Sequence, residues 1–311
     1  MDPQVEALLQ MMAAQAEATG APQMWELPAD VARANAEVSF AAFNQPMPES
    51  VAIADRAIPG PAGEIPVKVF TPRGNGPFPL LVFLHGGGWV IGSPATHARL
   101  CAELAEGAGV VVVSVHYRLA PEHPAPAPLN DCVAAIRWAV ANASEVNADG
   151  SRFAVGGDSA GGNLTAASML RLRDEGGPAA RLQLLLYGAY TMDNDLPSVI
   201  ENGDGKILTR KSMEWFYGHY LSGGASVEDP YIAPIKGDLR GLPPARLIAG
   251  TLDPLLDDSK LFAKALEDAG VPVKLSIYQD QPHIFMQLSA FLDGGKRGVA
   301  EACEALREAL A

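Results

Sequence analysis

Apolar and polar positions follow two distinct patterns along most of this chain. Short apolar runs are typical of strands, and a run without polar residues, such as residues 80–84, is typical of a strand buried on both faces. These runs predict strands at residues 53–58, 65–70, 80–84, 110–115, 153–156, 182–186, 245–249 and 273–278. Apolar residues at helical spacing predict helices at residues 3–18, 31–42, 95–107, 128–142, 159–175, 210–221, 257–269 and 295–310.

The order of these elements indicates the fold class. The turn sequence Pro-Gly-Pro-Ala-Gly at 59–63 separates the first two strands, which we expect to pair antiparallel. From residue 80 onward, strands and helices alternate. This alternation predicts an α/β protein with a mostly parallel, doubly wound sheet flanked by helices.

Two regions depart from the alternation. Residues 1–45 contain two helices ahead of the first strand, and residues 191–232 form a long insertion between two core strands. An insertion after the carboxyl end of a strand lies over the crevice where such folds bind ligands. We therefore expect residues 1–45 and 191–232 to form a helical cap over a core made of residues 46–190 and 233–311.

Composition excludes several classes of function. The net charge of −13, without a basic cluster, excludes nucleic acid as a partner. No apolar run approaches the length of a membrane span, which is about eighteen residues. The acidic first residues also lack the charged-then-apolar layout of a signal peptide. Cys101, Cys132 and Cys303 are isolated, which favours reduced thiols in a cytoplasmic protein over a disulfide framework or a metal site.

The stretch 155–163 carries the most informative motif, Val-Gly-Gly-Asp-Ser-Ala-Gly-Gly-Asn. Gly157 and Gly161 flank Ser159 in a G-x-S-x-G pattern between a predicted strand and a predicted helix. Small neighbours allow the sharp turn that lifts a serine hydroxyl above the sheet edge, where the helix N-terminus favours negative charge. An ordinary glycine-rich turn can have a similar sequence. The assignment of Ser159 as a nucleophile therefore also requires a base, an acid and an oxyanion site elsewhere in the chain.

An oxyanion site is predicted by the sequence His-Gly-Gly-Gly-Trp at 85–89, directly after the strand 80–84. Three glycines expose backbone N–H groups, and beside Ser159 they would bind an oxyanion together with the N–H of Ala160. A dinucleotide loop is the alternative, but the glycine spacing misses G-x-G-x-x-G by one residue. We therefore expect no nucleotide cofactor.

The base is expected to be a histidine that follows the serine. In this fold class the chain order is serine, acid, histidine. Of six histidines, only His219 and His283 follow Ser159, and His219 falls on the predicted helix of the inserted segment. His283, which lies just past the last strand on a loop that we expect to open a helix, is therefore the candidate base.

Three aspartates after the penultimate strand compete for the role of acid. Asp253 is nearest the strand end and precedes Pro254. Asp257 and Asp258 fall in the first turn of the next helix, where the helix dipole favours carboxylates. We expect Asp253 to be the acid, with Asp257 as the second candidate.

Together these motifs resemble the bacterial hormone-sensitive-lipase family of esterases, in its G-D-S-A-G branch. The resemblance covers about residues 50–290 and rests on four stretches in the expected order. These are His-Gly-Gly-Gly-Trp at 85–89, Tyr-Arg-Leu-Ala-Pro-Glu at 117–122, Gly-Asp-Ser-Ala-Gly-Gly-Asn at 157–163 and Asp-Pro-Leu at 253–255. One departure is Ile284, which stands directly after the candidate histidine, where the family usually has glycine.

The resemblance implies an α/β-hydrolase fold with a cap, and it assigns the functional residues. The implied triad is Ser159, His283 and Asp253. The implied oxyanion donors are the N–H groups of Gly87, Gly88 and Ala160, while the part played by Gly86 is left open.

The implied activity is hydrolysis of a small-molecule carboxylic ester through an acyl-enzyme intermediate, without a metal or cofactor. The resemblance suggests acyl chains of about two to eight carbons. Trp89, Phe216 and Tyr220 are candidates for walls of the substrate pocket, although the last two equally fit packing within the cap. The resemblance also makes a homodimer through the edge strand near 273–278 a reasonable expectation.

Rival functions on this fold differ at the same positions. A ligand-binding receptor that resembles this family keeps the serine but loses the histidine, whereas His283 is present here. An epoxide hydrolase or dehalogenase would have an aspartate in place of Ser159. Amide or lactone hydrolysis stays open, because the same triad serves these reactions.

Overall fold

A computed structural model describes all residues from 1 to 311. Its centre is one eight-stranded sheet with the strand order β1-β2-β4-β3-β5-β6-β7-β8. The β1–β2 and β2–β4 pairs are antiparallel and every other pair is parallel. The strands are β1 (Ala52–Gly60), β2 (Gly63–Thr71), β3 (Phe78–Leu84), β4 (Val111–Val115), β5 (Ala148–Asp158), β6 (Gln183–Leu186), β7 (Ala245–Leu252) and β8 (Val273–Pro282).

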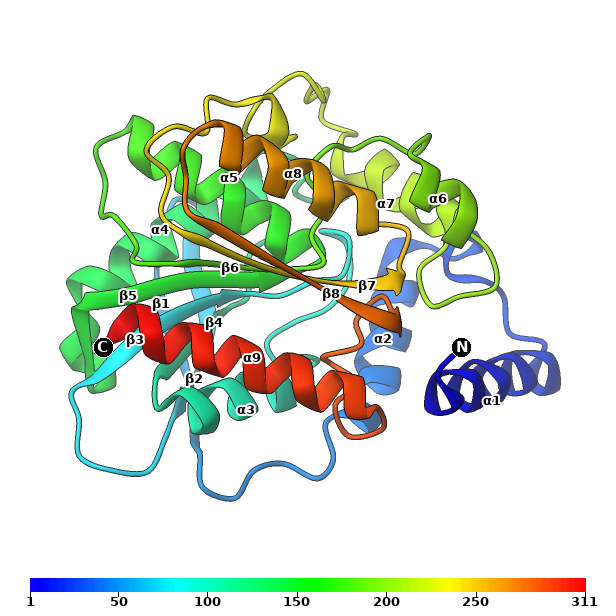
Figure 1. Ribbon diagram of the computed structural model, residues 1–311, viewed down its shortest axis with the longest axis horizontal. Helices are drawn as coiled ribbons and strands as arrows, with labels where there is room; N and C mark the ends of the chain where they lie inside the picture. The colour runs from blue at the N-terminus through cyan, green and yellow to red at the C-terminus, as the bar shows by residue number, and fades with distance from the viewer.

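Helices cover both faces of this sheet. The α-helices are α1 (Pro3–Thr19), α2 (Ala29–Phe43), α3 (Ala98–Ala108), α4 (Ala127–Ala141), α5 (Ala160–Asp174), α6 (Pro197–Asn202), α7 (Arg210–Tyr220), α8 (Leu256–Asp268) and α9 (Asp293–Leu310). Short 3₁₀ turns are η1 (Met24–Glu26), η2 (Ala143–Val146) and η3 (Pro234–Lys236). Figure 1 shows α4, α5 and α8 on one face of the sheet, and α3 and α9 on the other.

The central strand β3 explains why the sheet lies between two layers. Leu80, Val82 and Leu84 join the apolar core under α4, α5 and α8. The alternate residues Leu81 and Phe83 join the second core, under α3 and α9. Since side chains alternate between the faces of a strand, a continuous apolar run buries both faces. The predicted α/β class, with a mostly parallel sheet flanked by helices, is therefore confirmed.

Two local expectations need correction. The first is β5, which begins at Ala148 and not near 153, because Ala148 and Asp149 already pair with Phe78 and Pro79 at the start of β3. The second is the segment after β8, where residues 283–291 form a run of turns and not the start of a helix. Helix α9 starts at Asp293.

The register of the parallel strands gathers the predicted motifs at one edge of the sheet. Leu84 pairs with Gly157, so the glycine loop and the serine turn emerge side by side. Leu252 pairs with Pro282, so the next residue of each strand, an aspartate and a histidine, also emerge together. The carboxyl ends of parallel strands therefore bring four distant sequence motifs into one place.

The two segments of the predicted cap, residues 1–45 and 191–232, lie beside this edge of the sheet. Figure 1 shows α1, α2, α6 and α7 grouped where the strand arrows end. Segment η1 meets α7, and the ammonium of Lys211 lies 5.8 Å from the centre of the Trp25 ring. The Asn163 side chain donates to the carbonyls of Ala189 (2.7 Å), two residues before the inserted segment, and Ile232 (2.9 Å), its last residue. These bonds tie both ends of the insertion to α5.

None of the helices has the length and apolar character that crossing a membrane requires. The three cysteines carry free thiols, and all three are buried.

Candidate active site

Ser159 lies on the sharp turn between β5 and α5. Its backbone has φ +54° and ψ −120°, a region that is costly for a residue with a side chain. A Cβ on Gly157 would collide with the carbonyl of Gly161, and one on Gly161 would collide with the carbonyl of Leu84. The two flanking glycines are therefore required by close backbone approach, as the G-x-S-x-G pattern predicts.

The structure brings Ser159, His283 and Asp253 into one hydrogen-bonded chain. His283 Nε2 lies 2.9 Å from Ser159 Oγ, and His283 Nδ1 lies 2.7 Å from Asp253 Oδ2. Asp253 is fully buried, and its Oδ1 accepts a hydrogen bond from the N–H of Leu255 at 2.8 Å. A hydroxyl that faces an imidazole held by a carboxylate is the arrangement that turns serine into a nucleophile.

The competing aspartates face other partners. Asp257 accepts from the N–H of Ser198 at 2.9 Å. Asp258 Oδ1 accepts from the N–H of Tyr190 (2.7 Å) and from the N–H (2.8 Å) and hydroxyl (2.9 Å) of Thr191. Burial raises the pKa of Asp258 to about 7. Both side chains therefore anchor the inserted segment, and neither is hydrogen-bonded to His283.

The glycine loop at 85–89 lies beside Ser159. The N–H groups of Gly87 and Gly88 donate to no protein acceptor, and neither does the N–H of Ala160 at the first position of α5. Gly86 differs, because its N–H donates to Asp158 Oδ1 at 2.9 Å. The free donors are thus the three that the family resemblance implies, and Gly86 is engaged elsewhere.

A buried polar network holds this loop from below. Asp158 and His97 are buried, and His97 Nε2 lies 3.2 Å from Asp158 Oδ1. His97 Nδ1 lies 2.8 Å from the Thr96 hydroxyl, which donates to the carbonyl of Ser93 at 2.8 Å. The aspartate that precedes the serine in the motif therefore fixes the first glycine of the loop.

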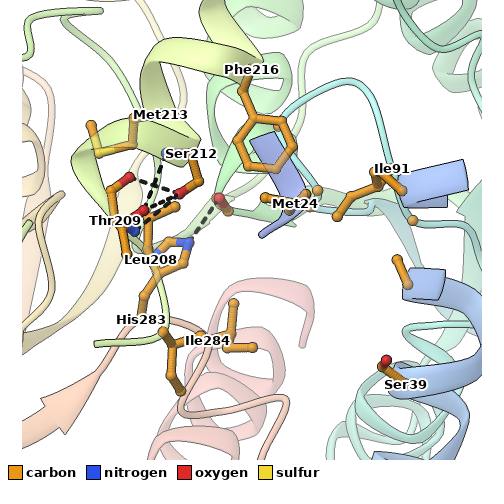
Figure 2. A pocket seen from close by; sticks show the side chains of 18 of the residues that line it. Met24, Ser39, Ile91, Leu208, Thr209, Ser212, Met213, Phe216, His283 and Ile284 are labelled. Atoms are coloured by element: carbon orange, nitrogen blue, oxygen red, sulfur yellow. Dashed lines mark hydrogen bonds between the residues drawn. The ribbon is translucent and has the colours of Figure 1, made fainter. Parts of the chain in front are cut away.

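A cavity of about 670 Å³ opens over Ser159 and His283. Its walls are mainly apolar and come from α1, η1, α2, the glycine loop, the segment 204–217 and the turns after β8. Figure 2 shows Phe216, Met24, Ile91 and Ile284 around the space beside His283, with the Ser39 hydroxyl further along it. A cavity of this size and character suits a small, mostly apolar ligand.

The three predicted aromatic residues differ in position. Trp89 and Phe216 line the cavity, and a Cβ on Gly88 would overlap the Phe216 ring. Tyr220 is fully buried and stacks on Trp89, with ring centres 4.4 Å apart and planes at 11°. Tyr220 does not line the cavity, so it supports Trp89 from behind.

Several residues that shape the site were not predicted. Asn163 and Asp158 lie within the serine motif, so the sequence marked both residues as parts of the site. It did not reveal their hydrogen-bond partners. The cavity walls on α2, among them Phe40 and Ala36, have the same spacing as ordinary helix core residues. Sequence alone therefore could not separate a ligand-facing position on α2 from a packing position.

Comparison with known proteins adds an independent line of argument. Residues 81–287 match a family model described as the alpha/beta hydrolase fold. The carboxylic ester hydrolase LipN of Mycobacterium tuberculosis is 43% identical over 264 residues, which cover 83% of this chain and 70% of LipN. Ethyl acetate hydrolase of Pseudomonas putida is 34% identical over an alignment of 316 residues, which covers 100% of this chain and 99% of the hydrolase. An esterase of Pyrobaculum calidifontis has a TM-score of 0.91 at 34% identity, with 100% of both chains covered.

Proposed function

From the premise that this chain belongs to the α/β-hydrolase family, in its bacterial hormone-sensitive-lipase branch, and is a carboxylic ester hydrolase, we propose a mechanism. Ser159 Oγ attacks the ester carbonyl while His283 Nε2 accepts its proton. Asp253 holds the imidazole with Nε2 toward the serine and stabilises the imidazolium. His283 then protonates the leaving alcohol, and a water activated by His283 releases the acid from the acyl-enzyme.

The observation that carries this proposal is the continuous chain from Ser159 Oγ through His283 to Asp253, at 2.9 Å and 2.7 Å, beneath the cavity. Either distance alone would fit structural hydrogen bonding. Together, with a strained serine backbone and unpaired N–H groups beside it, they provide the nucleophile, base, orienting acid and charge-stabilising donors of acyl transfer.

We further propose that the N–H groups of Gly87, Gly88 and Ala160 bind the developing oxyanion. Their lack of protein acceptors leaves them free for this role, and we do not propose Gly86 as a fourth donor because its N–H donates to Asp158. Donors fixed in advance beside the reacting carbon need no reorganisation when charge develops.

Residues 1–45 and 191–232 are proposed to act as the cap, with residues 46–190 and 233–311 as the catalytic core. The support is that the cavity walls opposite the glycine loop come largely from these two segments. The segments also touch each other at Trp25 and Lys211. A homodimer through β8 stays a proposal from the family resemblance alone.

We propose acyl chains of about two to eight carbons, because the mainly apolar cavity over Ser159 has a volume of only about 670 Å³. The ethyl acetate hydrolase among the relatives supports short acyl groups. With p-nitrophenyl esters from C2 to C16, kcat/KM is expected to peak at about four to six carbons and to fall about tenfold or more by C12, since an apolar pocket discriminates by its length. A maximum at C12 or C16 would contradict this assignment.

Changing Gly88 to alanine tests the oxyanion donors. Gly88 has φ +59°, and its new methyl group would displace either the loop or the Phe216 ring. We expect kcat to fall about 10²- to 10³-fold, as for loss of one oxyanion donor.

The matched control for this change is Gly270→Ala. Gly270 also has a positive φ, of +76°, but nothing lies within 4 Å of a Cβ placed there. The control carries the same kind of backbone strain and should retain kcat. Equal rates for both variants would remove Gly88 from the proposed oxyanion site.

A further inference from the structure

Three segments of the chain meet at the side chain of Arg33, on the cap helix α2. Its Nε donates to the carbonyl of Val90 at 2.9 Å, and its Nη2 donates to the carbonyl of Ala120 at 3.0 Å. The same guanidinium pairs with the Glu122 carboxylate, 2.9 Å from Nη2. A planar fork with five donors can hold several acceptors at once in fixed directions.

The first of these carbonyls belongs to the end of the glycine loop. The N–H groups of Val90 and Ile91 donate to the carbonyl of Gly87, at 3.1 Å and 2.9 Å. The N–H of Ala120 donates to the carbonyl of Trp89 at 2.9 Å. The carbonyls of Val90 and Ala120 are therefore parts of one hydrogen-bonded unit that continues into the proposed oxyanion donors.

Helix α2 carries a wall of the cavity on the residues that follow Arg33. Ala36 and Phe40 lie three and seven positions later, close to the same face of the helix, and both line the cavity. The fully buried residues of α2 are only the alanines 29, 32 and 36, and the larger Phe40 and Phe43 at its end pack against the core while only partly buried. Polar anchors therefore matter here, and the other one is Asn44, whose amide donates to the carbonyl of Ala95 at 2.7 Å.

We propose that Arg33 is a positioning residue that couples the α2 wall of the substrate cavity to the oxyanion loop. When the Arg33 guanidinium is bonded to both carbonyls, this one side chain fixes the position of α2 beside the cavity and the position of the Gly87 and Gly88 N–H groups. The proposal rests on the oxyanion role proposed above. The two bonds to backbone carbonyls carry the coupling, because Glu122 is half exposed and an ion pair in contact with water contributes little.

Three substitutions separate these contributions. Arg33→Met keeps the apolar stem and removes every donor, whereas Arg33→Lys keeps one charged donor that cannot bond to both carbonyls in the same way. Glu122→Gln removes the ion pair and leaves the carbonyl bonds intact. The control is Arg137→Met, which breaks a similarly exposed pair with Glu175 (2.9 Å) at the far end of α5 from Ser159.

We expect Arg33→Met to lower kcat for p-nitrophenyl acetate about 10- to 100-fold, since small misplacement of catalytic groups has effects of this size. KM for the hexanoate ester should rise more than KM for the acetate ester, because only the longer chain depends on the α2 wall. Arg33→Lys should lie between Arg33→Met and the wild type. Glu122→Gln should change kcat less than about fivefold, and Arg137→Met should not change it.

A readout without turnover completes the test. In the Ser159→Ala background, Arg33→Met should speed amide hydrogen exchange both in residues 86–92 and in α2. An unchanged kcat, an effect of Glu122→Gln as large as that of Arg33→Met, or faster exchange in α2 alone would each overturn the coupling. If Arg33→Met does not fold, Arg33→Lys is judged by the same criteria. Failure of the proposed function itself would give a different result: the Ser159→Ala variant with Arg33 unchanged would still hydrolyse esters.

Discussion

Replacing Ser159 by alanine is expected to lower kcat for short p-nitrophenyl esters by about 10⁴- to 10⁶-fold, the usual cost of removing a member of a catalytic triad. The Ser159 hydroxyl has a hydrogen bond to His283 and to no other protein group. Its removal therefore deletes the nucleophile without leaving any buried backbone group unpaired. The melting temperature should change little, because the turn is held by glycines and not by this hydroxyl.

Ser168→Ala is the matched control for this substitution. Ser168 lies on the helix that follows Ser159, is fully buried, and its hydroxyl has no hydrogen-bond partner. The variant should therefore keep its kcat. A folded Ser159→Ala protein that retains more than about a tenth of the wild-type rate would exclude Ser159 as the nucleophile.

The fold could be predicted because its signals are local. Residues 80–84 have no polar side chain, so the strand and its burial on both faces follow directly from the sequence. Helix α6 gave no such signal, because its six residues span less than two turns and show no period. The first half of β5 was missed because residues 149–152 are polar, and because the pairing of Ala148 and Asp149 with the start of β3 depends on a distant partner.

The candidate site divides in the same way. Ser159, the glycine loop and His283 stand in short motifs whose residue order is informative by itself. Arg33 has no comparable signal, since its acceptors Val90 and Ala120 are 57 and 87 residues away and offer only backbone carbonyls. Contacts to backbone leave no trace in the identity of the partner residue, so only the folded structure reveals them.

Asp253→Asn separates the triad acid from its neighbours. In the native structure, Oδ1 of Asp253 accepts from the Leu255 N–H at 2.8 Å, while Oδ2 faces His283 Nδ1 at 2.7 Å. An asparagine has one acceptor oxygen for these two places. If that oxygen stays with the Leu255 N–H, the NH₂ group points at Nδ1, and the imidazole must then carry its proton on Nε2, toward Ser159.

That tautomer cannot accept the serine proton, so kcat for Asp253→Asn should fall by about 10⁴-fold, with a modest change in melting temperature. Asp257→Asn alters a bond to Ser198 and a pair with Lys260 at 3.0 Å, and should have at most an intermediate effect on kcat. Asp258→Asn keeps an acceptor for its backbone donors and should change kcat little. If instead Asp253→Asn were nearly fully active and Asp257→Asn inactive, the acid would lie one helical turn later in the chain. The hydrogen bond between Asp253 and His283 would then be structural, and the orienting role would pass to the first turn of α8.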